Sequence, residues 1–266
     1  METLKIYATL ALLSVRARME YKASFLLFLV AILFFYLAQL GLLIVVLARF
    51  KEIHGWTTGE IAFLFGLLTF SQGFTTLFFN ALVNFDQMLI QGEFDRTLVR
   101  PLSPLGQVVF SRFEASTVAH FFLGAVALYY GAKYSGIEWS LKKDFFLPFV
   151  IVGGVMIQSA MRLSVSAVAF WTLRNSSLVH IVVFSSKEFI LYPVSIYSHG
   201  VQFFLTFLFP IAFVNFYPAQ YFLDKTGENL FHPALQMATP LVGALLFALS
   251  LYVWKRGIDH YQSSGS

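Results

Sequence analysis

The sequence predicts an all-α polytopic membrane protein. We expect six transmembrane helices, an N-terminal interfacial amphipathic helix, and a re-entrant helical element between spans five and six. Of the 266 residues, 58% are hydrophobic and only 12% are charged, about half the charged share of an ordinary soluble domain. Uncharged stretches long enough to cross a bilayer, about 20 residues, recur along the chain. Cysteine is absent, which excludes disulfides and thiolate chemistry.

Residues 1–23 are predicted to lie in the membrane interface as a helix. Two stripes at helical spacing support this, one of Lys5, Thr9, Arg16 and Glu20, and one of Ile6, Leu10, Leu13 and Ala17. The alternative is the first helix of a soluble bundle, but the uncharged stretch Phe25–Leu47 follows directly and favours the interfacial helix. That stretch is the first predicted span. We expect no cleavable signal peptide, because no small-residue cleavage site follows the leader.

Four further spans are predicted from uncharged or nearly uncharged stretches. They are Ile61–Val83, Ala115–Ala132, Phe145–Leu173 and Leu235–Trp254. Between the last two, residues 176–223 are apolar but too long for one crossing, and they are interrupted by Lys187, Glu188, Pro193, Pro210 and Pro218. Six spans with both termini in the cytoplasm give the stronger positive-inside bias, so we prefer six to seven. The surplus, residues 192–222, is then predicted to be a re-entrant element at the outer face.

Residues 84–112 form a charged loop that six spans place in the cytoplasm. Within it, "QGEFDRTLVRPLSPLGQ" predicts a short helix from Gly92 to Arg100. Glu93, Arg96 and Arg100 fall on one side of that helix, and Phe94 and Leu98 fall on the other. Pro101 and Pro104 are expected to end it. Apolar anchors and charges together suit a groove on a soluble partner, whereas the alternative is an interfacial helix that caps the bundle; spacing alone does not separate the two.

This stretch resembles a bacterial group of permeases in the type-2 class of ATP-binding-cassette exporters. The matching residues are Gly92, Glu93, Phe94, Asp95, Arg96, Leu98, Arg100, Pro101, Leu102, Ser103, Pro104 and Leu105. The chain end resembles the same group through Trp254, Lys255, Gly257, Tyr261, Ser263, Ser264 and Gly265, although an acidic residue and Ala would be expected at Gln262 and Ser264. "YPVSIY" (192–197) and "FLFPIAFVNFYPA" (207–219) resemble the group's region after the fifth span.

The resemblance implies a single permease domain over residues 1–266, working as a dimer with an identical or related permease. Two copies of a separate ATPase subunit, which would hold ATP and Mg, are expected to complete the complex in the bacterial inner membrane. The loop 84–112 would be the coupling segment that docks in the ATPase cleft, with the N-terminal helix as a second contact. Membrane lipids are expected as partners, and nucleic acid is not.

No catalytic site is predicted in this chain. It has no GxxxxGK[ST] phosphate loop, so ATP hydrolysis is expected in the partner, and its histidines show no metal-ligand spacing. Gly153 and Gly154 are expected to allow close helix packing rather than to bind phosphate. His120 is expected to be a satisfied interior histidine rather than a ligand.

Polar residues inside the spans are candidates for a translocation path. Arg162 is expected to face the bundle interior or water, beside Gln158 on the fourth span, although it could instead snorkel toward an interface. Gln72 and Asn80 on the second span either line the path or join helices by hydrogen bonds, and the second is favoured. Lys187 and Glu188 are expected to pair with each other or with neighbours, and to form a structural hinge near the fifth span rather than to contact substrate.

Three functions fit the sequence to different degrees. The first is the permease subunit of an exporter for an amphipathic or hydrophobic compound, such as a drug, lipid or peptide. The second is a secondary transporter or channel driven by an ion gradient, which would call for paired intramembrane carboxylates or an internal repeat; neither is evident. The third is a membrane anchor or assembly factor without transport. The presence of an ATPase partner separates the first from the others.

Overall fold

The computed structural model describes residues 6, 9, 13, 22–49, 52–112, 114, 116–225 and 230–262. This part of the chain is almost wholly helical, and its strands form a two-residue hairpin of β1 (Glu52–Ile53) and β2 (Trp56–Thr57). Three continuous helices in it are long and apolar enough to cross a membrane, and a bent pair raises the number to four. A helical membrane protein is therefore confirmed, and the figure of six spans stays a prediction.

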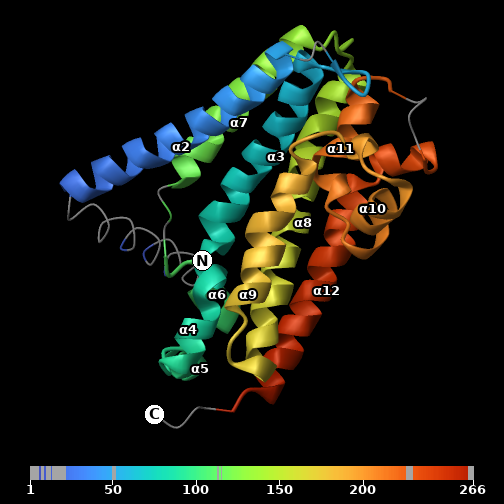
Figure 1. Cartoon of the computed structure of the whole chain (residues 1–266). Coiled ribbons are helices and arrows are strands. Elements are labelled where there is room, and N and C mark those ends of the chain that lie inside the picture. Colours follow the sequence, from blue (N-terminus) through green and yellow to red (C-terminus); the bar gives the residue numbers. More distant parts are fainter. Residues whose placement is uncertain are drawn as a thin grey trace.

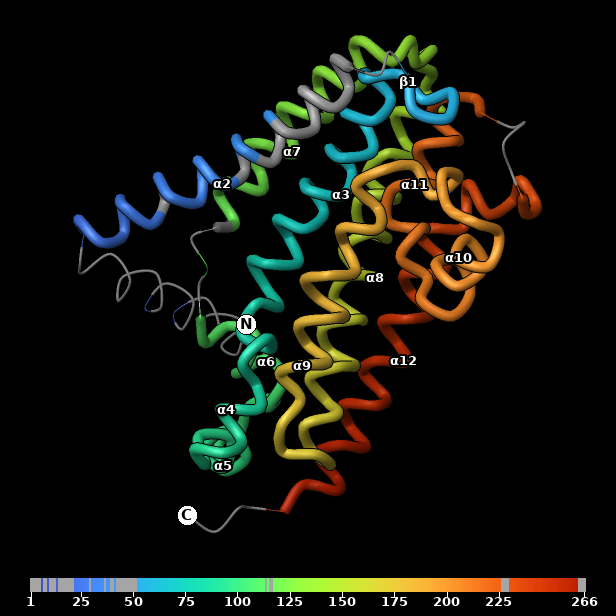
Figure 2. Tube along the Cα trace, in the orientation of Figure 1, coloured from blue at the N-terminus to red at the C-terminus, as the bar shows by residue number. Residues whose placement is uncertain are grey.

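Three long helices lie side by side and form the centre of the molecule (Figure 1): α3 (Thr58–Phe79), α8 (Leu141–Thr172) and α12 (Thr239–His260). The most extensive pairings are α8 with α12 and α3 with α7 (Ser116–Tyr134). Figure 2 shows α2 (Lys22–Arg49) running beside α7 at an angle to α3. The hairpin with β1 lies at one end of the bundle, and α5 and the end of α12 lie at the other.

The predicted spans agree with helices in position. The first lies within α2, the third within one residue of α7, and the fourth largely within α8. The second continues from α3 through η1 (Asn80–Asn84) into α4 (Phe85–Ile90), which together make one apolar stretch. The last was predicted to end at Trp254, but α12 continues to His260, because Lys255 and Arg256 are exposed on a helix that still packs through Trp254 and Gly257. The predicted interfacial helix falls outside the described residues, apart from residues 6, 9, 13, 22 and 23, of which the last two belong to α2.

Glycines allow the two closest helix pairs to form. Gly66 on α3 faces α7 so closely that an added Cβ would lie 2.6 Å from the backbone nitrogen of Leu128. On α12, a Cβ at Gly243 would lie 2.6 Å from the carbonyl oxygen of Gly153 on α8. Small residues let helix backbones approach in a membrane, where packing rather than water exclusion drives association. The expectation that Gly153 serves helix packing is confirmed.

The region after α8 is irregular, as its lysine, glutamate and prolines predict. Its elements are α9 (Ser176–Val179), the π-helix η2 (His180–Ser185), the 3₁₀ helices η3 (Ser186–Ile190) and η4 (Val194–Ile196), α10 (His199–Phe203), the π-helix η5 (Phe204–Leu208), α11 (Ala212–Phe222) and η6 (Pro233–Met237). The helical run 199–208 and α11 meet at 108°, and Pro210 lies in this bend. Pro193 stands just before η4. Pro218, however, lies inside α11 without ending it, which corrects the expectation that all three prolines break the element.

Candidate functional site

The coupling segment, residues 84–112, lies at the end of the bundle where α12 also ends (Figure 1). It contains α4, then α5 (Asp95–Leu98), and then α6 (Pro104–Val109). Ser103 caps α6 by accepting a hydrogen bond from the backbone nitrogen of Gly106, and Pro104 follows at the first helical position, where its missing N–H costs nothing. The segment is therefore a folded unit of three short helices rather than a simple connection.

Phe94 is the anchor of the coupling segment. Its side chain is 0% exposed and makes edge-to-face contacts with the rings of Phe85 (5.3 Å between centroids), Phe170 (5.4 Å) and Tyr261 (5.3 Å). Trp254 packs against the rings of Phe85, Phe94 and Phe170. These five residues, here called the aromatic cluster, come from α4, the start of α5, α8 and the end of α12. They tie the coupling segment to two of the three long helices.

Tyr261 makes a second link to the coupling segment. Its hydroxyl donates a 3.0 Å hydrogen bond to Oδ1 of Asp95, the first residue of α5. Desolvation of the hydroxyl, and the hydrogen bond and negative charge of Asp95, raise the pKa of Tyr261 to about 12. The tyrosine is therefore neutral, and able to donate, throughout the physiological range.

The turn from α4 into α5 depends on Gly92. Its φ of 67° is left-handed, a conformation that glycine adopts without the steric cost that a Cβ brings. The nitrogen of Gly92 donates to the carbonyl of Leu89, and that of Glu93 donates to the carbonyl of Met88, which closes α4 with a Schellman motif. Gly92 thus ends α4 instead of beginning the next helix.

The predicted helix Gly92–Arg100 is wrong in length, because helical geometry is confined to Asp95–Leu98. The predicted apolar edge is buried only in part. Phe94 is fully buried, whereas Leu98, one helical turn further along, is 39% exposed. The difference is tertiary, because the other rings of the aromatic cluster cover Phe94 and leave Leu98 near the surface.

An exposed tip remains at the surface of the coupling segment, made of Arg96 and residues 98–101. Val99 is 84% exposed, and the Arg96 side chain is 72% exposed and lies 3.9 Å from Glu93. Behind the tip, the buried side-chain amide of Gln107 donates to the carbonyl oxygens of Thr97 (2.8 Å) and Leu102 (3.3 Å). The tip is thus apolar at its centre, cationic on its flanks and braced from within.

Arg162 lies inside the bundle, which favours the interior position over the snorkelling alternative. It is 5% exposed, and its guanidinium donates to Oδ1 of Asn80 (3.3 Å) and Oγ1 of Thr76 (3.4 Å). The side-chain amide of Asn80 in turn donates to Glu114 over 3.1 Å. Asn80 therefore joins the second span to the fourth by hydrogen bonds, as favoured. Glu114 follows residues 84–112 by two positions, so this chain of contacts leads from the end of that segment to Arg162.

Gln158 and Gln72 line a small cavity next to Arg162. Gln158 also donates a 2.7 Å hydrogen bond to Ser71 on α3. The cavity lies between α3, α8 and the irregular segments η2 and η3, and measures about 20 Å³. The structure thus brings three of the predicted path residues, Gln158, Arg162 and Gln72, to one cavity. Asn80 contacts that group through Arg162 but does not line the cavity.

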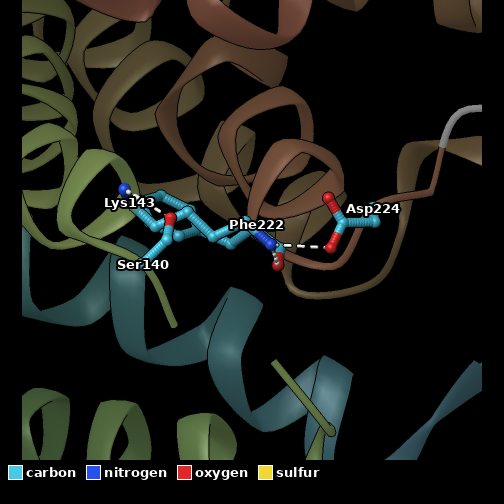
Figure 3. Close-up of polar contacts among 4 residues, drawn as sticks. All are labelled: Ser140, Lys143, Phe222 and Asp224. Carbon is cyan, nitrogen blue, oxygen red and sulfur yellow. Dashed lines mark hydrogen bonds and ion pairs between the residues drawn. The ribbon is translucent and has the colours of Figure 1, made fainter. Parts of the chain in front are cut away.

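The predicted re-entrant element is anchored at the end of the bundle that carries β1, away from α5. The sequence did not indicate the contacts that anchor it. Lys143, buried in the first turn of α8, donates to the carbonyl oxygen of Phe222 (2.9 Å) and to Oδ2 of Asp224 (2.6 Å), as Figure 3 shows. Lys225 lies 3.3 Å from Glu60 and donates to the carbonyl oxygen of Gly55. Two lysines therefore hold the end of α11 against the beginnings of α8 and α3.

Buried amide and hydroxyl contacts anchor the body of α11. Asn215, which is 0% exposed, donates to the carbonyl oxygens of Ile190 (2.7 Å) and Leu64 (3.3 Å). Thr239 at the start of α12 donates to the carbonyl oxygen of Phe213. The bond to Ile190 satisfies a carbonyl group of the irregular segment η3, and the other two join α11 to α3 and α12. The element consequently packs against the bundle, as the sequence predicted.

Several of these residues were missed by reasoning from the sequence. Phe85, Phe170 and Tyr261 come from distant segments, and nothing in their local spacing shows that they meet. Gln107 follows the Pro-Leu-Ser-Pro run, and a lone polar residue in an apolar stretch is the signal that could have identified it. Lys143 is one of two adjacent lysines, and only the fold shows which of the two is buried.

The described residues contain no group of three or more histidine, aspartate or glutamate side chains placed to hold a metal ion.

The family model described as ABC-2 family transporter protein matches residues 24–265 of the chain. No curated protein and no solved structure matches it. The match covers nearly the whole chain and agrees with its apolar helices. The chain therefore belongs to the ABC-2 transporter family and is a multi-pass membrane permease.

Proposed function

We propose that this chain is the permease subunit of an exporter, and that its coupling segment docks in the cleft of a separate ATPase. The carrying observation is the exposed tip: cationic and apolar side chains, Arg96 and residues 98–101, project from a segment whose anchor Phe94 is buried. Because Gln107 and the buried Phe94 hold the tip rigidly, a movement of the ATPase would be transmitted to the helices, whereas a flexible loop would not transmit it. Family membership supports an ATP-driven system over the alternative driven by an ion gradient.

The proposed topology has six spans, both termini in the cytoplasm, and a location in the bacterial inner membrane. Three helices meet the requirements for crossing outright; α2, α7 and the run from α9 to η3 complete the proposed six. In this arrangement residues 1–23 lie in the interface, residues 84–112 couple to the ATPase, and residues 192–222 re-enter from outside. The single permease domain pairs with an identical or related permease, and two ATPase copies hold ATP and Mg.

The proposed cargo is an amphipathic or hydrophobic compound, such as a drug, lipid or peptide. An apolar groove of about 390 Å³ between α3 and α8 supports this class, since Phe70, Phe74, Phe78 and residues of the first half of α8 line it. The small polar cavity beside Arg162 offers contacts for a polar group.

Charge reversal of the tip tests the docking proposal. We expect the double variant Arg96→Glu, Arg100→Glu to lose co-purification with the ATPase and at least about tenfold of transport-coupled hydrolysis, because like charges across an interface cost several kcal/mol. The matched control is Lys255→Glu, Arg256→Glu, which reverses two exposed cations at the same end of the bundle but outside the tip. Unchanged coupling in the first variant, or equal losses in both, would refute docking at the tip.

Cysteine labelling tests the topology, and the cysteine-free sequence makes it direct. Val99→Cys, at an exposed position of the tip, should react with a membrane-impermeant maleimide only after the cells are permeabilised. Glu138→Cys, an exposed position in the loop before α8, should react in intact cells. Labelling of position 99 in intact cells would overturn both the topology and the proposed docking site.

A further inference from the structure

A cavity inside the bundle is lined by an unusual set of side chains. Its walls come from α3, α8, the irregular segments η2 and η3, and the bend before α11. The lining residues are Leu68, Gln72, Gln158, Met161, Arg162, Val182, Val183, Ser186, Lys187 and Ile211. Two of these side chains are cations, three are neutral hydrogen-bonding groups, and none is a carboxylate.

The charge balance of this wall is positive. Arg162 and Lys187 reach the same cavity from α8 and η3, and they are close enough to repel each other. Glu188 attracts the neighbouring Lys187 electrostatically, but Glu188 itself is exposed and does not line the cavity. A charge at membrane depth is costly, and such residues usually mark substrate or ion pathways. Two cations that converge on one cavity suit a negatively charged group.

The position of Arg162 is fixed by its neighbours. The hydrogen bonds to Asn80 and Thr76 hold its guanidinium against α3 while the side chain borders the cavity. Gln158, one turn earlier on α8, is held by Ser71 and borders the same space. A preorganised planar guanidinium beside an amide donor is the arrangement that proteins use to bind carboxylate and phosphate groups.

The wall opposite α8 is built from irregular backbone. Val182 and Val183 belong to the π-helix η2, and Ser186 and Lys187 belong to the 3₁₀ helix η3 that follows it. π-Helical turns are rare and often mark functional sites. Interrupted helices in membranes border water-filled cavities, and in transporters they commonly border the substrate site. The irregularity is a second observation, independent of the charges, that points to a ligand.

From these contacts we infer that the cavity binds the anionic group of the transported compound, with Arg162 and Lys187 as its cationic contacts and Gln72 and Gln158 as hydrogen-bond donors. The inference rests on the proposed transport function and narrows its cargo to amphipathic acids: compounds that join an apolar body to a carboxylate or phosphate. The cavity now has room for about one water molecule. The anionic group consequently enters by displacing η2 and η3, the irregular wall.

Binding of tritiated oleate to the purified full-length permease, in neutral maltoside micelles and without ATPase or ATP, tests this inference. Unlabelled oleate should displace the bound probe, and oleyl alcohol, which has the same chain without the charge, should compete at least about tenfold more weakly. Arg162→Gln and Lys187→Gln should each weaken oleate binding about tenfold, the cost of losing one charge-assisted contact. Arg162→Lys and Lys187→Arg keep the charge and should restore part of the affinity, which separates recognition from a loss of folding.

Arg174→Gln is the matched control, because Arg174 is an exposed cation between α8 and α9 that does not line the cavity. Displacement of oleate by inorganic phosphate would identify the bare anion as sufficient. Displacement by phosphatidylglycerol but not by phosphatidylcholine or phosphate would identify a lipid headgroup as the source. An oleyl alcohol that competes as well as oleate, oleate binding unchanged in both glutamine variants, or no oleate binding to the wild type would each overturn the inference.

The two proposals fail separately. The tip variant Arg96→Glu, Arg100→Glu should keep oleate binding while it loses ATPase coupling, because the tip and the cavity are different parts of the molecule. Loss of coupling with no oleate binding in the wild type would leave docking intact and remove the anion site. Oleate binding in the wild type, together with intact ATPase coupling in the tip variant, would support the anion site and refute docking at the tip.

Discussion

The hydroxyl of Tyr261 donates a 3.0 Å hydrogen bond to Oδ1 of Asp95, across 166 positions of sequence. This bond joins the residue that follows α12 to the first residue of α5, and the Tyr261 ring adds an edge-to-face contact with Phe94. The end of the last long helix and the coupling segment are thus held as one body. A force applied to the tip is expected to reach α12 and α8 together.

Tyr261→Phe should loosen the coupling segment without emptying the aromatic cluster, because the ring stays and only the hydroxyl is lost. A hydrogen bond of this kind contributes about 1 kcal/mol, so we expect tryptic cleavage after Arg96 to become about fivefold faster. Tyr252→Phe is the control, since its exposed hydroxyl accepts only a local bond from Arg256. An equal cleavage rate in Tyr261→Phe and the wild type would show that the bond does not hold the segment.

The same bond should be insensitive to pH until strongly alkaline conditions. The folded pKa of Tyr261, about 12, lies above its ordinary value of 10.0, with desolvation as the first cause and Asp95 as the second. The stabilisation is therefore fully present below pH 10 and is lost as the pH rises toward 12. The tyrosinate absorbance of the wild type minus that of Tyr261→Phe should titrate near 12. A midpoint near 10 would contradict the buried, hydrogen-bonded hydroxyl.

Phe94→Ala should destabilise the end of the molecule that carries α5. It removes a fully buried ring from the centre of the aromatic cluster, a change that typically costs about 3–5 kcal/mol. Thermal unfolding of the purified protein measures the loss. Val99→Ala, five residues further along and 84% exposed, should change stability by less than about 0.5 kcal/mol. Similar unfolding temperatures for the two variants would contradict the assignment of Phe94 as the anchor.

Gly66→Ala should force α3 and α7 apart. The added Cβ would lie 2.6 Å from the backbone nitrogen of Leu128, and a backbone atom has no flexible end that could move aside. Overpacking of this kind costs about 1–3 kcal/mol. Gly41→Ala on α2 is the control, because no atom lies within 4 Å of its new Cβ. Thermal unfolding should separate the two variants, and a neutral Gly66→Ala would mean that the seam is looser than described.

Lys143→Met should release the end of the re-entrant element. It removes the two bonds in Figure 3 and leaves the carbonyl of Phe222 without this donor, at a cost of about 1–3 kcal/mol. Faster proteolysis after Lys225 should report the release. Lys142→Met is the control, because the neighbouring lysine is exposed. Equal proteolysis in both variants would remove Lys143 from the anchor.

Local sequence signals located the helices because each depends on residues close together in the chain. Uncharged stretches of the required length placed α3, α8 and α12, and Pro210 marked the bend before α11. The charged loop with its two prolines was recognised as a separate structure, and the structure chose the interior position of Arg162 over the snorkelling alternative that the sequence left open. The direction of Phe94 could not be read in this way, because its burial depends on α8 and on the residue after α12.

The sequence by itself determined that this is a membrane protein. It also determined the approximate positions of the spans and the candidate residues for coupling, because hydropathy, charge and proline act locally. Only the tertiary structure decided which side chains meet. It placed Phe94 in the aromatic cluster, paired Lys143 rather than Lys142 with Asp224, and brought Lys187 to the cavity beside Arg162. Those contacts join residues far apart in the chain, and packing of the complete helices fixes them where local preference is silent.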